Sequence, residues 1–574
     1  MFSSWPKPTF RKREDMKIYS PLFTGLMLLS LVSCSTRAKK ITDEKEVVEV
    51  KKEQVQIRIL AFNDFHGNLE GPSGSVMVEG KRVKAGGADF LAAKIKERRT
   101  ENTMVVSAGD LIGASPLISA VFHDEPTIEA ANLMGLELNA VGNHEFDEGV
   151  DELKRMQKGG CHPTDGCQDG DGFSGATFKF LAANVFEKSN GETIFASTAI
   201  KKFGDISVGI VGLTLEGTPS VVSSEGIQSV RFGDEVEAIN KAVSEFQAQG
   251  IETIVVLVHE GGFPTSDQAD RNQCPGISGP ILEIAKNSSD AVDVFITGHT
   301  HKAYICEMDG KLVTAAKSYG RLLTEIDLVI DPITGDVLSR EANNIVIDRQ
   351  GIGQENVKQV ISKYRAIVSP IANKPIGKIA SDFKRDYDEN GISPLGRLIA
   401  DVQLEGTQSA GAQIAFMNPG GIRAPLNFIA SGVEGEGVVT YSEAHTSQPF
   451  GNSLVTMTLT GAQLKLLLEA QFRDKKITIL QPSSGFIYTW SQSAPFGTKV
   501  DPASMKLGGI TIERMKEYRI TVNSFLADGG DGFKLLKHGT KRVGGPIDVE
   551  ALVNYFSIHS PVKVSTDVRV LKKK

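Results

Sequence analysis

Short apolar runs that alternate with helical segments constrain the fold of this chain more than any other feature. The runs read VQIRILAFND, MVVSAGD, SVGIVGLT, TIVVLVHE and DVFITGHTH, and segments such as GADFLAAKIKERR and DEVEAINKAVSEFQAQG lie between them. Runs of this kind are typical of buried strands, and their alternation with helices is typical of α/β proteins. We therefore predict an α/β architecture with buried strands for this part of the chain.

A second region has the same character. It contains AQIAFMNPGGIRA, the helix TGAQLKLLLEAQFR, in which Thr460 and Gln463 have capping-box spacing, and then YRITVNSFLADGGDGF. The connector QENVKQVISKYRAIVSPIANKP precedes it, and Pro370 and Pro375 are predicted to end its helix and to mark a hinge. A chain of 574 residues accommodates two to four domains. We predict one domain at residues 55–350, a helical connector at 351–376 and a second domain at 377–574.

The N-terminus has the pattern of an export signal. A basic head that includes Arg11 and Lys17 precedes an apolar stretch at residues 18–33, and LVSC ends at Cys34. This pattern resembles a bacterial lipoprotein signal peptide at residues 1–34, with Met16 as an alternative start. A spanning anchor is disfavoured because the stretch is shorter than roughly 20 residues. We expect an exported chain that is lipid-anchored at Cys34 in the cell envelope and contacts the membrane only there.

The segment after the signal and the overall charge restrict the partners. Residues 35–54 are charged and aperiodic, which predicts a solvated tether. The net charge is −7 and the pI is about 5.9. A general nucleic-acid binder needs a basic surface that neutralises the phosphate backbone. We therefore expect no nucleic-acid polymer as a partner.

The cysteines support export to an oxidising compartment. Besides Cys34, the chain has an even number of cysteines, namely Cys161, Cys167, Cys274 and Cys306. Three pairings are possible, and we favour Cys161–Cys167 and Cys274–Cys306. A zinc site made of cysteines is disfavoured because the chain has no CxxC pair.

Five predicted strand ends carry side chains that bind metals. These are Asp64 at the end of ILAFND with His66 just beyond it, Asp110 at the end of MVVSAGD, Asn143 and His144 in NAVGNHE, His259 in IVVLVHE, and His299 and His301 in VFITGHTH. One such end alone usually indicates a turn, in which glycine relaxes the backbone and aspartate caps the next helix. Five in order indicate a site, because burying so many titratable groups without cations costs several kcal/mol each. Ligands gather at the carboxyl ends of strands, and Asp, Asn and His together suit a two-metal hydrolytic centre.

The motifs NDFHG, GD, GNHEFD, HEGG and GHTH, in this order, resemble the calcineurin-like metallophosphatase domain of the 5′-nucleotidase family. NPGGIR, QPFGN and FLADGGDGF extend the resemblance to about residues 55 to 570. It implies an N-terminal β-sandwich flanked by helices and a C-terminal α/β domain that binds substrate. It also implies metal-dependent hydrolysis of nucleoside 5′-phosphates, with UDP-sugars as further candidates, and a domain rotation about the connector.

The resemblance further implies roles for individual residues. It assigns Asp64, His66 and His301 to one divalent ion and Asn143, His259 and His299 to a second, with Asp110 as the bridge between them. It implies that His144 and Asp147 form a catalytic dyad. It also implies that Phe450 and Phe525 sandwich the base and that Asn418, Arg423 and Asp531 contact base, ribose or phosphate. The two ions would be Zn, Mn, Co or similar. The i, i+3 spacing of His144 and Asp147 lets the carboxylate favour the charged imidazole. Phe146 is expected to pack in the core, and Glu145 has no role.

One departure and three rivals remain. Further arginines of the family have no clear match in FKRDYDENGISPLGRLIAD, where Arg385 and Arg397 are the candidates. A 2′,3′-cyclic-nucleotide phosphodiesterase with 3′-nucleotidase activity would share all the metal motifs. A non-catalytic surface binding lipoprotein is disfavoured by the intact ligand set, and a sulfur-oxidation hydrolase by Phe450 and Phe525.

Overall fold

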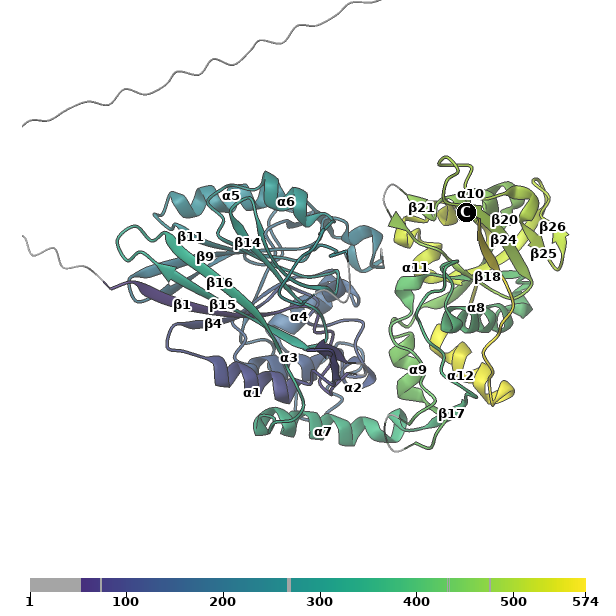
Figure 1. The fold of residues 1–574 in the computed structure, drawn as a ribbon. Helices are drawn as coiled ribbons and strands as arrows, with labels where there is room; N and C mark the ends of the chain where they lie inside the picture. The colour runs from purple at the N-terminus through teal and green to yellow at the C-terminus, as the bar shows by residue number, and fades with distance from the viewer. Residues whose placement is uncertain are drawn as a thin grey trace, which may run out of the picture. The chain divides into compact units, whose positions relative to one another are not determined.

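Figure 1 shows the computed structural model, which describes residues 53–72, 75–223, 225–265, 270–430, 432, 434–473 and 476–573. The predicted signal segment, Cys34 and all of the tether except its last two residues lie outside these ranges. Within the described residues, no helix has both the length and the apolar character that a membrane span requires.

Two six-stranded sheets form the centre of the first region. The first sheet has the order β16 (Val337–Val346), β15 (Leu322–Ile330), β1 (Val55–Phe62), β4 (Thr103–Ser107), β5 (Leu138–Ala140) and β6 (Lys179–Leu181). The second has the order β13 (Ala303–Met308), β14 (Lys311–Ala316), β12 (Val294–Thr297), β11 (Thr253–Val258), β9 (Ile206–Leu213) and β8 (Thr198–Phe203). Strands β1, β4, β5 and β6 run parallel, as do β9, β11, β12 and β14. Two short ribbons pair β2 (Val76–Val78) with β3 (Lys81–Val83) and β7 (Val185–Glu187) with β10 (Val230–Phe232).

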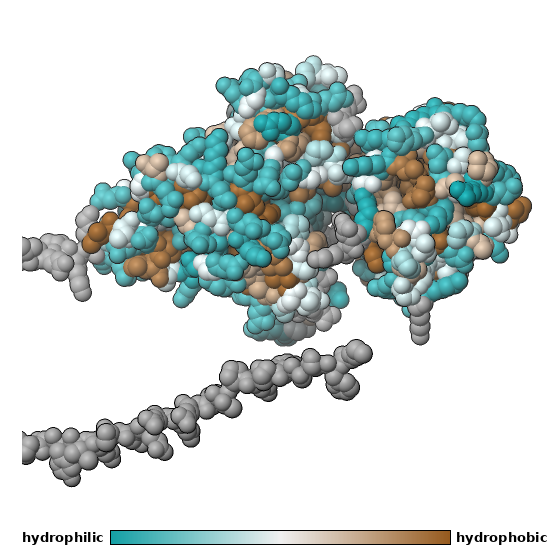
Figure 2. Space-filling view, turned by 90° about the horizontal axis from the view of Figure 1, so that it is seen from above, coloured by the Kyte–Doolittle hydropathy of each residue, from teal (hydrophilic) through white to brown (hydrophobic). Residues whose placement is uncertain are grey.

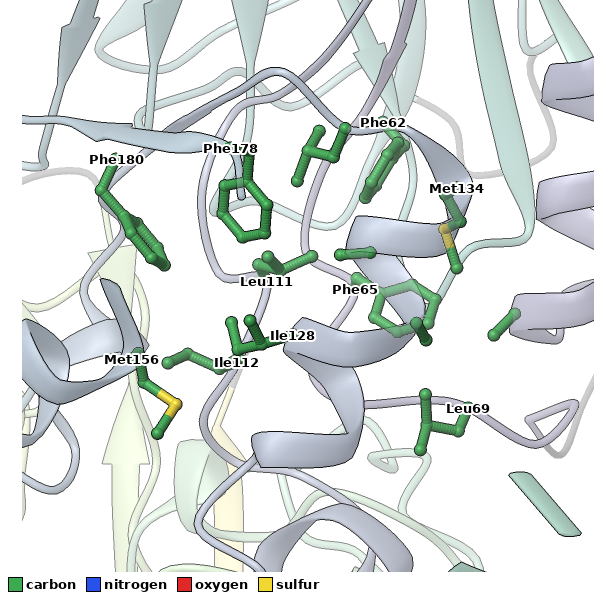
Figure 3. Close-up of a cluster of buried hydrophobic side chains, with 14 of the residues drawn as sticks. Phe62, Phe65, Leu69, Leu111, Ile112, Ile128, Met134, Met156, Phe178 and Phe180 are labelled. Atoms are coloured by element: carbon green, nitrogen blue, oxygen red, sulfur yellow. The ribbon is translucent and has the colours of Figure 1, made fainter. Parts of the chain in front are cut away.

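Helices cover the outer faces of the two sheets (Figure 1). The helices are α1 (Ala88–Arg98), α2 (Leu117–Ala120), α3 (Glu125–Met134), α4 (Val150–Lys158), α5 (Glu235–Gln247), α6 (Ile281–Asn287) and α7 (Glu355–Ala372). One apolar cluster, with Ile59 and Val255, contains strand residues of both sheets. A second, drawn in Figure 3, packs Phe62 and Phe65 with Ile128 of α3 and Met156 of α4. The first region is therefore a β-sandwich flanked by helices, as predicted.

The second region is built on a five-stranded and a four-stranded sheet. The larger has the order β23 (Gln481–Pro482), β18 (Ile414–Met417), β27 (Glu517–Asn523), β20 (Ser453–Thr460) and β28 (Thr540–Ile547), and the smaller β26 (Ile510–Thr511), β25 (Lys506–Leu507), β24 (Phe486–Ser491) and β29 (Val570–Lys573). Ribbons pair β17 (Pro375–Lys378) with β19 (Val438–Thr440) and β21 (Phe472–Arg473) with β22 (Lys476–Ile477). The helices are α8 (Pro394–Gly406), α9 (Tyr441–Ser447), α10 (Gly461–Glu469), α11 (Ser524–Ala527) and α12 (Asp548–His559). The predicted capping box of Thr460 and Gln463 is present at α10.

The connector differs from its prediction. Helix α7 runs through Pro370 and ends at Ala372, so Pro370 does not break it. Pro370 lacks the backbone N–H that would donate to the Ala366 carbonyl, but the helix continues past it, and the Asn373 amide donates to the Ser369 carbonyl at 3.0 Å. Val357, Ile361 and Tyr364 on one face of α7 belong to the same apolar cluster as Phe62. The helix therefore packs as part of the first region.

Disulfides and surface character complete the fold. The structure joins Cys161 to Cys167 and Cys274 to Cys306, the pairing that the sequence favoured. On the face shown in Figure 2, hydrophobic residues form separate patches among hydrophilic ones. The large apolar clusters consist mainly of buried residues.

Candidate active site

The seven predicted metal ligands come from the ends of strands in both sheets. Asp64 and His66 follow β1, Asp110 follows β4, Asn143 follows β5, His259 follows β11, and His299 and His301 follow β12. Since β1, β4 and β5 belong to one sheet and β11 and β12 to the other, the site lies where the carboxyl ends of two sheets meet. The sequence predicted a common edge but not that two sheets share it.

The structure brings these side chains into two groups that share Asp110. In each group the ligand atoms all lie within 4.8 Å of one another, and the groups are Asp64, His66, Asp110 and His301, and Asp110, His259 and His299. In the first group, His301 Nε2 lies 3.1 Å from His66 Nε2 and 3.2 Å from Asp64 Oδ1. In the second, His259 Nε2 lies 2.9 Å from Asp110 Oδ2. Asn143 Oδ1 lies 2.9 Å from His299 Nδ1, which adds the amide to the second group.

Backbone carbonyls fix which ring nitrogen of two histidines faces the site. His66 Nδ1 donates to the Gly113 carbonyl at 2.9 Å, and His259 Nδ1 donates to the Ala108 carbonyl at 2.8 Å. A carbonyl only accepts, so Nδ1 of each ring carries a proton, and Nε2 is the nitrogen that faces the carboxylates. Outer hydrogen bonds of this kind orient imidazoles that bind metals.

The backbone of the site is strained. Five of the seven predicted ligands have positive φ, namely Asp64 at 49°, His66 at 48°, Asp110 at 51°, His299 at 66° and His301 at 55°. Such conformations are uncommon for residues other than glycine, and each costs of order 1–3 kcal/mol. Because backbone strain recurs at the predicted ligands, it indicates that their placement has a use other than stability.

Burial controls the charge of the imidazoles. It lowers the pKa of His66 well below its usual value, lowers that of His301, and lowers that of His299 to about 3. Burial also acts on His259, but the charge of Asp110 outweighs it and raises the pKa of His259 to about 10. Three of the four imidazoles are thus neutral at pH 7, the form that ligates metals. Neutral imidazoles beside buried carboxylates fit divalent cations.

His144 and Asp147 form a close pair beside the ligands. His144 lies in a short 3₁₀ turn, His144–Phe146, and its Nδ1 lies 2.9 Å from Asp147 Oδ2. The His144 amide donates to Asp110 Oδ1 at 2.8 Å. Burial lowers the pKa of His144, but Asp147 and Asp110 outweigh it, so the pKa lies above its usual value. The carboxylate therefore favours the charged imidazole, as expected from the spacing.

Glu145 is the residue whose importance the sequence did not reveal. Its side chain is buried, and it accepts hydrogen bonds from the amides of Asp110 at 2.9 Å, Leu111 at 2.8 Å and Gly142 at 2.7 Å, and from Asn139 Nδ2 at 3.2 Å. It thereby joins the loop of the bridging aspartate to the GNHEFD loop. The sequence did contain a signal for this role, because Glu145 lies between glycines, and a carboxylate that is buried there needs hydrogen-bond donors.

Gly142 and Phe146 fill structural positions in the same motif. A side chain at Gly142 would collide with Asp110 and with Glu145 Oε2. The glycine therefore permits the close approach of the two loops. Phe146 is fully buried in an apolar cluster, as predicted.

The predicted substrate residues lie in the second region, with Phe525 in α11, Asp531 in a short 3₁₀ turn and the other three on loops. Asn418 Nδ2 donates to Asp531 Oδ2 at 2.8 Å, and Asn523 Nδ2 donates to Asn418 Oδ1 at 3.0 Å. The Phe450 ring lies 5.6 Å from the His144 ring, and the Arg423 guanidinium lies 5.7 Å from the Phe450 ring. The Phe525 ring lies against the backbone of Gly530, so close that a Cβ at position 530 would approach the ring to 2.5 Å.

The structure separates the two candidate arginines. Arg385 Nη1 donates to the carbonyl of Arg423 at 2.6 Å. Arg397 instead donates to the Ser565 carbonyl at 3.1 Å and to Asp388 at 3.4 Å. Arg385 is therefore the guanidinium beside Arg423.

Two family models match the chain. The calcineurin-like phosphoesterase model matches residues 57–303, and the model of the 5′-nucleotidase C-terminal domain matches residues 372–538. The chain is 33% identical over 534 residues to the endonuclease YhcR of Bacillus subtilis, covering 90% of this chain but 41% of YhcR. It is 30% identical over 531 residues to the cell wall protein Lmo0130 of Listeria monocytogenes, covering 87% of this chain and 67% of that protein.

A solved structure is similar along its whole length. The crystal structure of a 5′-nucleotidase precursor from Thermus thermophilus has a TM-score of 0.73 and 26% identity, covering 90% of this chain and 99% of that one. The metallophosphatase domain implies that the first region binds divalent metals.

Proposed function

Since the chain belongs to the 5′-nucleotidase family, whose members are phosphoric monoester hydrolases, we propose that it hydrolyses nucleoside 5′-monophosphates to nucleosides and phosphate outside the cytoplasm. The chain spans less than half the length of YhcR, so the activity of that protein is not transferred to it. The observation that carries the proposal is the convergence of seven metal-type side chains beside the His144–Asp147 pair.

The donor set supports two divalent cations such as Zn²⁺, Mn²⁺ or Co²⁺. Asp64, His66 and His301 would hold one, Asn143, His259 and His299 the other, and Asp110 both. When bound, such a pair supplies Lewis acidity to the phosphoryl group and lowers the pKa of an attacking water. The opposed Nε2 atoms of His66, which is buried, and His301, which is partly buried, lie 3.1 Å apart and fit this arrangement.

His144 supplies a proton or a positive charge at the reacting phosphoryl group. Asp147 holds Nδ1, which leaves Nε2 for a phosphoryl oxygen or the leaving oxygen. A donor at such an atom is worth most when charge develops there in the transition state. The Glu145 carboxylate, which accepts from the Asp110 amide, and the Asp110 carboxylate, which accepts from the His144 amide, position the loop that carries His144.

The second region selects the substrate in this proposal. Phe450 and Phe525 offer faces for a nucleobase, and stacking contributes about 1–3 kcal/mol per base. Arg423 Nη2 is buried and makes no hydrogen bond within the described residues, which suits an anionic group of the substrate. Asn418 and Asp531 supply polar contacts to ribose or base.

Replacement of His144 tests the reaction. His144→Ala is expected to lower kcat for AMP by about 10²–10⁴-fold, the range typical of a positioned acid or base. Metal content should be unchanged, because His144 is outside both ligand groups. The measurement pairs phosphate release with metal analysis, and unchanged turnover would contradict the proposed role.

A substrate panel decides between related activities. The panel contains AMP, UDP-glucose, 2′,3′-cyclic AMP and single-stranded DNA. The DNA is included because one relative is an endonuclease by name. The proposal expects the highest kcat/KM for AMP. Phosphate release that survives EDTA would contradict the metal-dependent mechanism. The name of Lmo0130, a cell wall protein, agrees with a location outside the cytoplasm.

A further inference from the structure

A second group of metal-type side chains lies outside the seven ligands. His123, Glu148 and Glu152 line a cavity of about 110 Å³, and their ligand atoms lie within 4.8 Å of one another. His123 lies between α2 and α3, Glu148 directly follows Asp147, and Glu152 is in the first turn of α4. The group combines one imidazole with two carboxylates, a ligand set that suits Zn²⁺, Mn²⁺ and similar ions.

Asp165 and His162 fix the orientation of the His123 ring. Asp165 Oδ2 lies 3.0 Å from His123 Nε2, while His123 Nδ1 lies 2.6 Å from Glu148 Oε2. The His162 ring stacks on His123 at 3.8 Å, with an angle of 12° between the planes. A histidine that binds a metal usually donates its other nitrogen to a carboxylate, and Asp165 occupies that position.

The loop that carries these neighbours is closed covalently. Cys161 and Cys167 flank both His162 and Asp165, and their Cα atoms lie 4.7 Å apart. Because the loop is closed, Asp165 has fewer positions open to it. Asp165 therefore loses less conformational entropy when it holds His123 in place. The disulfide loop, which the proposed reaction does not use, thus acquires a role in orienting His123.

The charges around the cavity favour a cation. Asp124, Asp147, Glu148 and Glu152 all line it, against the imidazoles of His123 and His144. Arg155 donates to both oxygens of Glu152, with Nη2 and Nε to Oε1 at 2.6 and 3.0 Å and with Nε to Oε2 at 2.8 Å, and its Nη1 donates to Glu125 at 2.5 Å. One guanidinium divided between two carboxylates leaves the cavity with net negative charge, which a divalent ion would offset.

We propose that His123 Nδ1, Glu148 and Glu152 bind a further divalent cation, separate from the ions of the active site. None of the three belongs to either active-site group, although His123 also lies near His162 and Asp165. Because Glu148 follows Asp147, an ion here also fixes the turn that carries the dyad. The site does not depend on which substrate the enzyme takes.

Metal counting tests the site. The full chain is saturated with Mn²⁺ or Zn²⁺, freed of excess metal, and analysed for ions per chain. His123→Gln and Glu148→Gln, tested separately, should each retain about one ion fewer than the parent, because metal sites lose affinity when a ligand is removed. His559→Gln is the matched control, since His559 also pairs with a glutamate, Glu405, at 2.9 Å.

The outcomes are distinct. Equal metal content in the parent and in both variants overturns the proposal and leaves His123 as an ion pair with Glu148 and Asp165. A loss that the His559 control shares also overturns it. Nucleotide hydrolysis is measured on the same samples, but the ion count stands whether or not AMP is hydrolysed, so failure of this site and failure of the proposed reaction remain distinguishable.

Discussion

At the scale of single residues, Glu145 shows how a side chain that touches no predicted ion determines the ligand geometry. Three of its partners are backbone amides, and two of these belong to Asp110 and Gly142 on different loops. All three amides are donors, so only an acceptor satisfies them. The position of Asp110 is therefore tied to the GNHEFD loop by one carboxylate.

Glu145→Gln is expected to weaken metal binding. The amide group of glutamine places a donor against backbone donors, and a buried unsatisfied group costs about 1–3 kcal/mol. Loss of such outer contacts lowers metal affinity about 10–100-fold, and we expect that range in a Mn²⁺ or Zn²⁺ titration.

Two controls separate positioning from loss of stability. Glu235→Gln changes another buried glutamate, which accepts from the Glu216 amide at 2.7 Å away from the ligands. It should lower Tm without changing metal affinity. Glu145→Asp keeps the acceptor oxygens and should recover part of the affinity. Wild-type affinity in Glu145→Gln would contradict the positioning role.

At the scale of elements, α7 shows what a pattern alone leaves open. The sequence predicted the helix, but the surface against which it packs depends on contacts far along the chain. Tyr364 Oη donates to Glu129 at 3.0 Å and to Asp169 at 2.9 Å, and Lys363 Nζ donates to Asp169 at 2.7 Å. These contacts attach α7 to the first region, so we place the proposed hinge after it, at residues 373–374.

Helix α12 carries a pH-dependent contribution to stability at its first residue. Asp548 is 2% exposed, and burial raises its pKa to about 7. The folded state then holds a proton that the unfolded state has released, so the free energy of unfolding falls as pH rises from about 4 to 7. The total loss is at most about 4 kcal/mol, since one pKa unit is about 1.4 kcal/mol.

Asp548→Asn should remove this dependence. Asparagine keeps an acceptor for the Val549 amide, which Asp548 Oδ1 binds at 2.8 Å, but it cannot ionise. Unfolding of the second region, followed in urea between pH 5 and 8, should therefore vary less with pH in the variant. The exposed Asp336→Asn serves as control, and an identical pH slope in parent and variant would rule out the assignment.

At the scale of the whole molecule, the sequence predicted the local elements and the order of the motifs, but not the arrangement of the motifs in space. Strand runs and the capping box at Thr460 follow from local sequence, because period and capping are local properties, whereas the cysteines allowed three pairings, of which the favoured one is observed. The meeting of two sheets at one site does not, since it depends on the packing of strand residues from both sheets, such as Ile59 and Val255, in one apolar cluster. Glu145 and the His123 group escaped notice because Glu145 binds the amides of Asp110 and Leu111, and His123 pairs with Glu148 and Asp165, all of which lie far from them along the chain.

Metal removal should destabilise one part of the molecule and not the other. The predicted ligands join the ends of strands in both sheets of the first region, whereas the second region contributes none of them. Ions that bind only the native state stabilise it by about 3–4 kcal/mol at 100 to 1,000 times their Kd. Calorimetry with EDTA should therefore lower the unfolding transition of the first region and leave that of the second in place.

The same experiment on His144→Ala separates stabilisation by metal from catalysis. His144 belongs to neither ligand group, so the inactive variant should show the parent's EDTA-dependent shift, and Zn²⁺ or Mn²⁺ should restore the transition in both. If EDTA shifted neither transition, the seven side chains would have to be stabilised without ions. That outcome conflicts with neutral buried imidazoles facing carboxylates at backbone positions as strained as those of Asp64 and His66.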